Sequence, residues 1–468
     1  MSTRKDKFSK KDKKYMSLAL TLASAQHGLT GENPSVGCVI VKNDEIISIG
    51  QTGYNGRPHA ESIAIKNSTE ILEGSTMYVT LEPCNHYGNT PRCTKEIIKN
   101  RISKVIYSVE DIDKKYMSLA LALASARHGL TGENPSVGCV IIKNDEIISI
   151  GQTGYNGRPH AESNAIKNAT EILEGSTMYV TLEPCNHYGK TPPCTKEIIK
   201  NRISKVIYSI EDIDKKVKGK SFKILSKNII VKKGLLNEEI NNFYKPYFFN
   251  RKNKIPYVTG KIAISKNNLI FSKGSKRITN IHSDKFTHFL RYRNDSLMIT
   301  YKTLNEDNPK LSCRLEGLKK FSPKRIILDN DLKTNINSYI FKTVNKVNTI
   351  IFYNKANKAK ISIFKKKGIK LIKSNLLKNG NFDIKSILKK LYNLGCRNLL
   401  VEGGNDLSKS IIKNKLFNQF YLFKSTKNLS KLVSHKDFNG FKDLSQIYKS
   451  KNKINAQLGK NSITLYRK

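Results

Sequence analysis

The first hundred residues alternate between two hydrophobic periods, one typical of helices and one typical of strands. Apolar residues recur at helical spacing over residues 15–27, and Gly28 follows as a helix stop. Two short β-rich runs, residues 36–41 and 45–49, come next and are joined by an Asn-Asp turn. This segment therefore predicts a helix followed by a β-hairpin.

Helices and strands continue to alternate after the hairpin. The predicted elements are a helix over residues 59–72, a strand over 76–80, a helix from about Thr90 and a strand over 104–108. The order helix, strand, strand, helix, strand, helix, strand predicts a mixed sheet covered by helices. The expected fold class is a layered α/β fold.

The same stretch of sequence occurs twice. Residues 12–112 recur as residues 113–213, and the two copies differ at eight positions. The differing pairs are Thr21/Ala122, Gln26/Arg127, Val41/Ile142, Ile63/Asn164, Ser68/Ala169, Asn89/Lys190, Arg92/Pro193 and Val109/Ile210. A period of this length, with complete helix and strand patterns inside it, indicates a duplicated domain rather than a solenoid.

The chain after the second copy adds new elements. Residues 217–231 predict a helix and a strand that the first copy lacks, and further strands are predicted near residues 257–264, 296–300, 325–328 and 398–401. We therefore expect five parts: a basic tail (1–11), a first copy (12–112), a complete second copy (113–236), a linker helix (237–253) and a separate α/β domain (254–468).

Composition and charge narrow the choice of partners only slightly. A chain of 468 residues suffices for about three domains. The net charge of +45, from 83 Lys and Arg against 38 Asp and Glu, would suit nucleic acid or a phosphorylated substrate. The excess is mostly lysine and is spread through every segment beside abundant Asn and Ile, which indicates a compositional cause rather than a binding patch.

Hydrophobic runs and cysteines bear on the cellular compartment. The sequence has no run of 18 apolar residues, so we expect no transmembrane segment and no membrane partner. The basic N-terminus lacks the apolar core of a secretory signal, which favours a cytoplasmic location. Eight cysteines in such a chain indicate metal ligands or buried thiols more than disulfides. Cys38 and Cys139, inside apolar strands, are expected to be core thiols.

Each copy carries one histidine and two cysteines at a spacing that suits a metal. The predicted ligands are His59, Cys84 and Cys93 in the first copy and His160, Cys185 and Cys194 in the second. One imidazole and two thiolates leave the fourth position of a tetrahedral zinc open for water, which is typical of a catalytic zinc; a structural zinc is the alternative. Zinc lowers the pKa of such a water toward neutrality.

Glu61 and Glu162 each lie two residues after the metal-binding histidine. A carboxylate at this spacing can move protons without joining the metal shell. Zinc deaminases use this combination for hydrolytic attack on an amino-bearing ring carbon. The sequence therefore predicts a zinc-dependent deaminase with Glu162, and Glu61 in the first copy, as catalytic residues.

The same residues carry a resemblance to a known family. The strings NPSVGC (33–38), PHAE (58–61) and TLEPCNHYGKTPPC (181–194) resemble the bifunctional deaminase and reductase of riboflavin biosynthesis. The resemblance implies two cytidine-deaminase-like domains, one Zn²⁺ per active copy, and deamination of a phosphorylated ribosylamino-pyrimidine. It also implies that Asn134 and Lys190 contact the substrate.

The domain over residues 254–468 is similar to the family's reductase, a relative of dihydrofolate reductase. The matching positions include Lys261, Ser265, Ile278, Thr279, Leu290, Pro309, Asp329 and the string EGGNDL (402–407). The resemblance implies NADPH contacts by Thr303, Asp307, Asn330, Gly404, Asn405, Asp406 and Leu407. It implies substrate contacts by Ser275, Arg291, Leu311, Arg314 and Glu402, and it leaves open a homo-oligomer formed through this domain. Arginines can bind phosphate with paired hydrogen bonds, and a glycine turn lets backbone N–H groups approach phosphate.

A bifunctional enzyme acting on a small phosphorylated pyrimidine is the preferred interpretation, with three alternatives. The reductase departs from the family pattern at Asn267, Asn268, Arg277 and Asn330, so deaminase activity alone is the first alternative. A zinc deaminase acting on nucleic acid is the second, although the chain lacks the stripe of aromatic and basic residues that stacks bases. An inactive scaffold is the third.

The differences between the copies favour the second as the working one. Lys190 and Pro193 match the family pattern, and a lysine at this position could neutralise a substrate phosphate. Asn164 is also more typical of the family than Ile63. Because both metal sets are retained, we expect zinc in the first copy as well and most of the turnover in the second.

Overall fold

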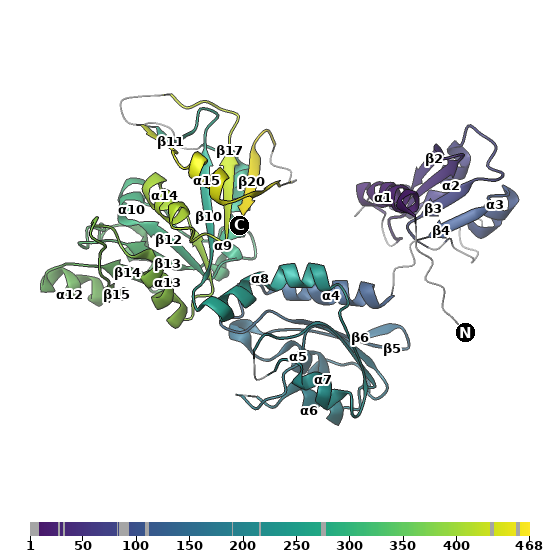
Figure 1. Cartoon of the computed structure of the whole chain (residues 1–468), viewed down its shortest axis with the longest axis horizontal. Coiled ribbons are helices and arrows are strands. Elements are labelled where there is room, and N and C mark those ends of the chain that lie inside the picture. Colours follow the sequence, from purple (N-terminus) through teal and green to yellow (C-terminus); the bar gives the residue numbers. More distant parts are fainter. Residues whose placement is uncertain are drawn as a thin grey trace. The chain divides into compact units, whose positions relative to one another are not determined.

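The computed structural model describes residues 9–26, 29–30, 33–81, 83, 93–107, 112–189, 191–214, 217–272, 278–430, 435–454 and 459–468. The chain divides into two compact units, Met1–Lys115 and Tyr116–Lys468. Among the described residues, no helix combines the length and the apolar character needed to cross a membrane. The first unit holds the first copy, and the second unit holds the second copy and the C-terminal domain (Figure 1).

The first unit is a four-stranded sheet in the order β2-β1-β3-β4, with α1 residues packed on one face and α2 and α3 residues on the other. Its elements are α1 (Lys10–Ala25), β1 (Gly37–Lys42), β2 (Glu45–Gln51), a 3-10 turn (Tyr54–Gly56), α2 (Ala60–Asn67), β3 (Thr76–Val79), α3 (Cys93–Lys99) and β4 (Lys104–Tyr107). Strand β1 is antiparallel to β2 and β3, and β4 is parallel to β3. The predicted order of elements is confirmed, although α2 ends five residues before the predicted helix end.

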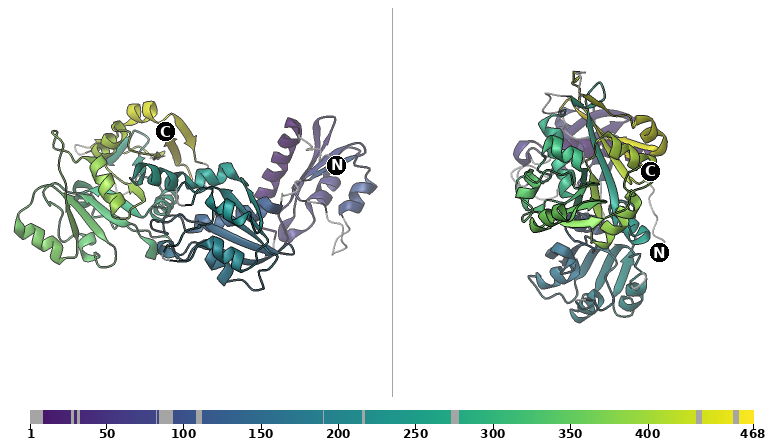
Figure 2. Two further views of the ribbon diagram at one scale, coloured as in Figure 1. Left: turned by 60° about the horizontal axis from the view of Figure 1, so that its bottom comes forward. Right: turned by 90° about the vertical axis from the view of Figure 1, so that its left-hand side faces the viewer.

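Helix α1 lies directly on β1, as Figure 2 shows. A side chain at Gly37 would place its Cβ 1.9 Å from the carbonyl oxygen of Ala19, so only glycine allows this approach. The central strand is buried on both faces, with Cys38 in one hydrophobic cluster and Val39 in the other. Cys38 is therefore the core thiol that the sequence predicted.

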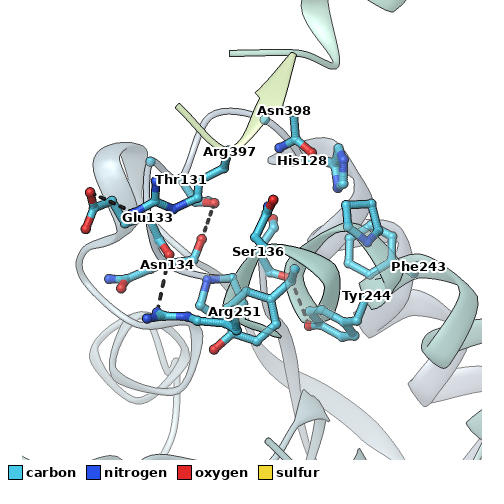
Figure 3. A pocket seen from close by; sticks show the side chains of 16 residues that line it. His128, Thr131, Glu133, Asn134, Ser136, Phe243, Tyr244, Arg251, Arg397 and Asn398 are labelled. Atoms are coloured by element: carbon cyan, nitrogen blue, oxygen red, sulfur yellow. Dashed lines mark hydrogen bonds and ion pairs between the residues drawn. The ribbon is translucent and has the colours of Figure 1, made fainter. Parts of the chain in front are cut away.

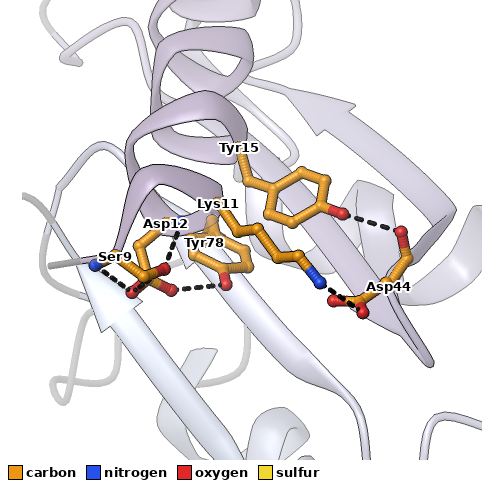
Figure 4. Close-up of polar contacts among 6 residues, drawn as sticks. All are labelled: Ser9, Lys11, Asp12, Tyr15, Asp44 and Tyr78. Carbon is orange, nitrogen blue, oxygen red and sulfur yellow. Dashed lines mark hydrogen bonds and ion pairs between the residues drawn. The ribbon is translucent and has the colours of Figure 1, made fainter.

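Helix α1 begins inside the stretch predicted to be a tail. Ser9 and Asp12 form a capping box, in which the Ser9 side chain accepts from the Asp12 N–H and the Asp12 side chain accepts from the Ser9 N–H (Figure 4). The Tyr78 hydroxyl donates to Asp12 over 2.8 Å and ties this helix start to β3. The capping box therefore sets the helix start at Lys10.

The second copy repeats this fold and extends it. Its elements are α4 (Ile112–Ala126), β5 (Gly138–Lys143), β6 (Glu146–Gln152), a 3-10 turn (Tyr155–Gly157), α5 (Ala161–Lys167), β7 (Thr177–Leu182), α6 (Cys194–Lys200), β8 (Lys205–Ile210), α7 (Lys220–Leu225), β9 (Ile230–Lys233) and α8 (Asn237–Asn253). Its sheet has five strands in the order β6-β5-β7-β8-β9. The helix and strand predicted to complete the second copy are α7 and β9.

Helix α8 matches the predicted linker in its bounds, but it also belongs to the core of the second copy. Ile240 and Tyr244 of α8 are buried in the same cluster as β5, β7 and β8. Leu182 is only 2% exposed under this cover, whereas its counterpart Leu81 in the first copy is 44% exposed. The second copy therefore has a fuller core than the first.

The C-terminal domain is built on a nine-stranded sheet in the order β15-β14-β13-β12-β16-β10-β17-β20-β19. Its strands are β10 (Tyr257–Ile264), β12 (Ser296–Thr300), β13 (Lys324–Leu328), β14 (Thr349–Tyr353), β15 (Lys370–Lys373), β16 (Asn398–Val401), β17 (Gln419–Lys424), β19 (Ser450–Lys453) and β20 (Ser462–Arg467). The run from β15 to β17 is parallel, and β20 and β19 add antiparallel strands at one edge. Strands β11 (Leu269–Ser272) and β18 (His435–Asp437) form a separate pair.

Helices cover both faces of this sheet and enclose two hydrophobic clusters. One cluster takes residues from α13 (Ile384–Asn393), α14 (Asn405–Lys413) and α15 (Phe441–Ile447). The other takes residues from α9 (Ile281–Tyr292), α10 (Tyr301–Asp307), α11 (Tyr339–Lys342) and α12 (Lys358–Lys366). Because helices cover both faces, central strands such as β14 and β16 carry apolar residues at nearly every position.

Candidate active sites

Three elements of the second copy bring the predicted metal ligands together. His160 is the residue before α5, Cys185 lies three residues beyond the end of β7, and Cys194 is the first residue of α6. The His160 Nδ1 atom lies 3.3 Å from the Cys194 sulfur and 3.5 Å from the Cys185 sulfur. The two sulfurs are 3.5 Å apart. The three ligand atoms therefore form a compact triangle.

The size of this triangle fits zinc. Zinc–sulfur bonds of about 2.3 Å and zinc–nitrogen bonds of about 2.0 Å in a tetrahedron separate the ligand atoms by roughly 3.5–3.8 Å. The observed separations of 3.3–3.5 Å are close to these values. Hydrogen bonding with Cys194, together with nearby His160, lowers the pKa of Cys185, and zinc binds the thiolate form. His160, Cys185 and Cys194 thus offer a donor set suited to zinc.

Glu162 lies in the first turn of α5, beside the metal set. Glu162 is only 4% exposed, and burial raises the pKa of its carboxyl group to about 7. A carboxyl group with a pKa near the working pH can both accept and donate a proton. The position and the pKa of Glu162 therefore suit a proton shuttle.

The first copy brings the same types of residue together. The His59 Nδ1 atom lies 3.3 Å from the Cys93 sulfur, and Glu61 lies within reach of both. Burial also raises the pKa of Glu61. Cys84 lies outside the described residues, so its place in this set stays a prediction.

Buried polar contacts around the second metal set were not found from the sequence. Glu183, which follows β7, accepts hydrogen bonds from the backbone N–H groups of Asp212, Gly219 and Ser221 over 3.0–3.3 Å. These bonds fasten the start of the Cys185 loop to the α7 segment that the first copy lacks. The string LEPC contains this glutamate, but no local signal shows that its partners lie 29 to 38 residues later.

Of the two predicted substrate contacts of the second copy, the structure describes Asn134 but not Lys190. The Asn134 side-chain amide donates to the carbonyl oxygen of Gly157 over 2.9 Å. Asn164, which distinguishes this copy from Ile63, donates to the carbonyl oxygen of Gln152 over 2.8 Å. Lys190 lies outside the described residues. The substrate roles of Asn134 and Lys190 stay predictions.

A cavity of about 1080 Å³ opens beside the carboxyl ends of β12, β13 and β16 in the C-terminal domain. Most of the predicted cofactor and substrate residues line it: Arg291, Thr303, Asp307, Leu311, Asn330, Glu402, Gly404, Asn405, Asp406 and Leu407. Ligands of open α/β sheets bind at this edge of the sheet. Ser275 and Arg277 lie outside the described residues. Arg314 is exposed and is not among the residues that line the cavity.

Arg291 and Glu402 form a buried ion pair at the wall of this cavity. The Nε and one terminal nitrogen of Arg291 each donate to a different oxygen of Glu402 over 2.7 Å. The other terminal nitrogen donates to the carbonyl oxygen of Ser312 over 3.1 Å. Burial by itself would raise the pKa of Glu402, but the Arg291 guanidinium holds it below its usual value. The Nε atom and both terminal nitrogens of Arg291 therefore already have hydrogen-bond partners within the protein.

The start of helix α14 faces the same cavity. Gly404 precedes the helix without a side-chain cap, and a Cβ at Gly404 would meet open space. Uncapped N–H groups at a helix start attract phosphate, so this turn suits a dinucleotide cofactor. Asp307, at the end of α10, also lines the cavity, and partial desolvation there raises the pKa of its carboxyl group. Lys302, Lys333 and Lys436 also line the cavity, the latter two in ion pairs with the lining residues Asp331 and Glu306, and the sequence did not predict them at this site.

Comparisons with family models divide the chain in the same way. Residues 9–109 and 110–210 each match the cytidine and deoxycytidylate deaminase zinc-binding region. Residues 256–429 match the RibD C-terminal domain.

Individual relatives match along most of the chain. The riboflavin biosynthesis protein RibD of Aquifex aeolicus is 34% identical over 363 residues, which cover 77% of this chain and 99% of the relative. That of Actinobacillus pleuropneumoniae is 33% identical over 314 residues, which cover 66% of this chain and 83% of the relative. Among solved structures, the diaminohydroxyphosphoribosylaminopyrimidine deaminase/5-amino-6-(5-phosphoribosylamino)uracil reductase of Thermotoga maritima is 28% identical, with a TM-score of 0.65 over 76% of this chain and 98% of that one.

Proposed function

Because the chain belongs to the RibD family of bifunctional deaminases and reductases of riboflavin biosynthesis, we propose that it deaminates 2,5-diamino-6-(5-phosphoribosylamino)pyrimidin-4-one and then reduces the ribosyl group to ribityl with NADPH. The resemblance drawn from the sequence and the predicted fold class are confirmed. The nucleic-acid deaminase, the deaminase without reductase activity and the inactive scaffold are not favoured. The observation that carries the substrate proposal is the match over nearly the whole length of the relatives.

We propose that Glu162 moves the protons of the deamination. His160, Cys185 and Cys194 would hold the zinc ion, which when bound makes water a nucleophile at neutral pH. Glu162 accepts a proton from the attacking water and delivers it to the departing amino group. The C–O bond forms first and makes the ring carbon tetrahedral; the exocyclic C–N bond then breaks, ammonia leaves, and the carbonyl forms with the second water proton on the ring nitrogen. The buried carboxyl group with a pKa of about 7 supports both halves of this transfer.

We propose that the second copy performs most of the turnover and that the first copy contributes little. The second copy has the fuller core, the fifth strand and the Glu183 anchor for its cysteine loop. It also has Lys190, which would neutralise a substrate phosphate, where the first copy has Asn89. Substrate contact by Asn134 rests on the family resemblance.

We propose that the large cavity of the C-terminal domain holds NADPH and the deaminated product. NADPH supplies the hydride for reduction of the ribosyl group. The start of α14 would bind a cofactor phosphate, with Thr303, Asp307 and Asn330 at the same wall. The Arg291–Glu402 pair would face the product. A cytoplasmic location and a homo-oligomer through this domain stay predictions.

An assay of the purified, zinc-quantified protein on the aminopyrimidine ribotide tests this function. We expect ammonia release followed by NADPH oxidation in the same sample. Ammonia without NADPH oxidation would refute the proposed reductase step. Neither signal from zinc-loaded protein would refute the proposed substrate.

A further inference from the structure

Side chains of the reductase domain hold the end of helix α4 in the second deaminase copy. The Arg293 guanidinium donates to the carbonyl oxygen of Ser125 over 2.6 Å, and the Tyr292 hydroxyl donates to that of Ala126 over 2.7 Å. These are last-turn carbonyls of α4, where a positive charge is favourable. The loop over residues 128–136 starts directly after this point and is called the junction loop below.

Arg397 of the reductase domain binds the junction loop by an ion pair. Its terminal nitrogen lies 2.9 Å from a carboxylate oxygen of Glu133 (Figure 3). The other terminal nitrogen donates to the carbonyl oxygen of Tyr392 over 2.6 Å, and the guanidinium lies 3.9 Å from the centre of the Tyr392 ring. Arg397 is therefore fixed within its own domain and presents a defined donor to Glu133.

The junction loop connects Arg397 to the deaminase site. Asn134, next to Glu133, donates to the carbonyl oxygen of Gly157 in the turn Tyr155–Gly157. His160 follows this turn by three residues. A change in the position of Glu133 therefore reaches both a predicted substrate contact and the approach to the metal set.

A second contact from the reductase domain reaches the same turn. The Tyr155 ring stacks on the Phe321 ring with centres 5.3 Å apart, and the Arg127 guanidinium covers the Tyr155 ring at 3.8 Å. Tyr155 is 46% exposed here, whereas its counterpart Tyr54 in the first copy is 71% exposed. Arg127 is one of the eight differences between the copies. The turn is thus held in the copy that we propose to be active.

A small cavity lies between the junction loop, helix α8 and Arg397. Its volume of about 40 Å³ has room for about three water molecules at 10–15 Å³ each, and not for a substrate. The Asn250 side-chain oxygen in its wall has no protein partner among the described residues, so water is its expected partner. The domains are therefore linked here by the direct contacts and not by a shared ligand.

We propose that Arg397 is a positioning residue for the deaminase: through Glu133 it holds the junction loop in the conformation that binds the aminopyrimidine substrate. This proposal rests on the proposed function. The Arg397 side chain is 11% exposed and the Glu133 side chain 62% exposed, so solvent at Glu133 screens the pair and the pair adds little to stability. Removal of the Glu133 carboxylate therefore changes the geometry of the loop without unfolding the domain.

Steady-state kinetics of Arg397→Gln and Glu133→Gln in the full chain test the proposal. We expect each variant to raise the KM of ammonia release on the order of 3- to 10-fold with little change in kcat. The double variant should be no worse than either single one, because both remove the same contact. Arg397→Lys should be intermediate, since lysine keeps the positive charge but lacks the planar pair of terminal nitrogens by which Arg397 contacts Tyr392 and Glu133. Zinc content and NADPH oxidation on the deaminated product should not change.

The same change in the other copy is the matched control. Glu32→Gln, at the equivalent position of the first copy, should leave the KM unchanged. Wild-type kinetics in both Arg397→Gln and Glu133→Gln would overturn the proposal, as would additive effects in the double variant or a parallel loss of zinc. Failure of the proposed function is distinguishable, because the unsubstituted protein would then release no ammonia.

Discussion

The hydroxyl group of Tyr244 joins helix α8 to the second deaminase copy, so its removal tests whether this helix is part of the deaminase fold. Tyr244 is fully buried and lies 2.7 Å from the Thr181 hydroxyl and 2.8 Å from the Ser136 carbonyl oxygen. Tyr244→Phe keeps the ring and its contacts but removes both hydrogen bonds.

The expected cost follows from these two bonds. A buried hydrogen bond contributes about 1 kcal/mol net, and an acceptor left unpaired costs somewhat more. The Thr181 hydroxyl keeps its bond from the Gly138 N–H, but the Ser136 carbonyl loses its tyrosine donor. We therefore expect a loss of about 2 kcal/mol, which corresponds to a roughly 30-fold increase in local opening.

Hydrogen exchange followed by mass spectrometry can measure the loss of local stability in each copy separately. Strand β5 and strand β1 differ in sequence only at Ile142 and Val41, so their peptides differ in mass. Exchange in β5 should accelerate about 30-fold, while β1 serves as the internal control and should not change. An unchanged rate in β5, or equal acceleration in both strands, would refute the assignment of α8 to the core of the second copy.

The C-terminal domain yields two further predictions, and the metal site yields one. Burial raises the pKa of Asp295 to about 6, so its ionised form opposes folding; the free energy of unfolding should rise by roughly 1 kcal/mol as the pH falls from 7 to 5, and Asp295→Asn should remove this slope in urea titrations. If Asp295→Asn keeps the pH dependence of the unsubstituted protein, the raised pKa of Asp295 is contradicted. Glu402→Gln leaves the buried charge of Arg291 without its carboxylate, so we expect the free energy of unfolding to fall by about 3–5 kcal/mol. NADPH oxidation should be lost and ammonia release retained; normal NADPH oxidation would argue against a role of the Arg291–Glu402 pair in the reductase site. Chelation of zinc should stop ammonia release and spare NADPH oxidation on the deaminated product, and loss of both signals would contradict separate sites.

Local sequence patterns predicted most of the duplicated fold. The strands were predictable because β1 and β3 are short, β-rich and bounded by turn residues. The proximity of His160, Cys185 and Cys194 was predictable because one histidine and two cysteines at that spacing are typical of a zinc-binding set. Such features depend on residues close together in the sequence.

Contacts between distant residues were not predictable in the same way. Helix α8 reads as a linker because its buried residues, Ile240 and Tyr244, form a narrow stripe in a mostly polar segment. Arg291 was expected to contact the substrate, but the sequence did not predict its pairing with Glu402, which lies 111 residues further along the chain. Sequence periodicity carries no information on such pairs, since they depend on how strands of the sheet are ordered.

Substitution of the two buried glutamates, one at a time, tests most directly which copy deaminates. The measurement is the kcat of ammonia release by zinc-quantified Glu162→Gln and Glu61→Gln proteins on the aminopyrimidine ribotide. We predict that Glu162→Gln lowers kcat at least about 100-fold, the usual contribution of a general acid and base, whereas Glu61→Gln keeps most of the activity. The reverse result, or an equal loss in both variants, would contradict the assignment of turnover to the second copy.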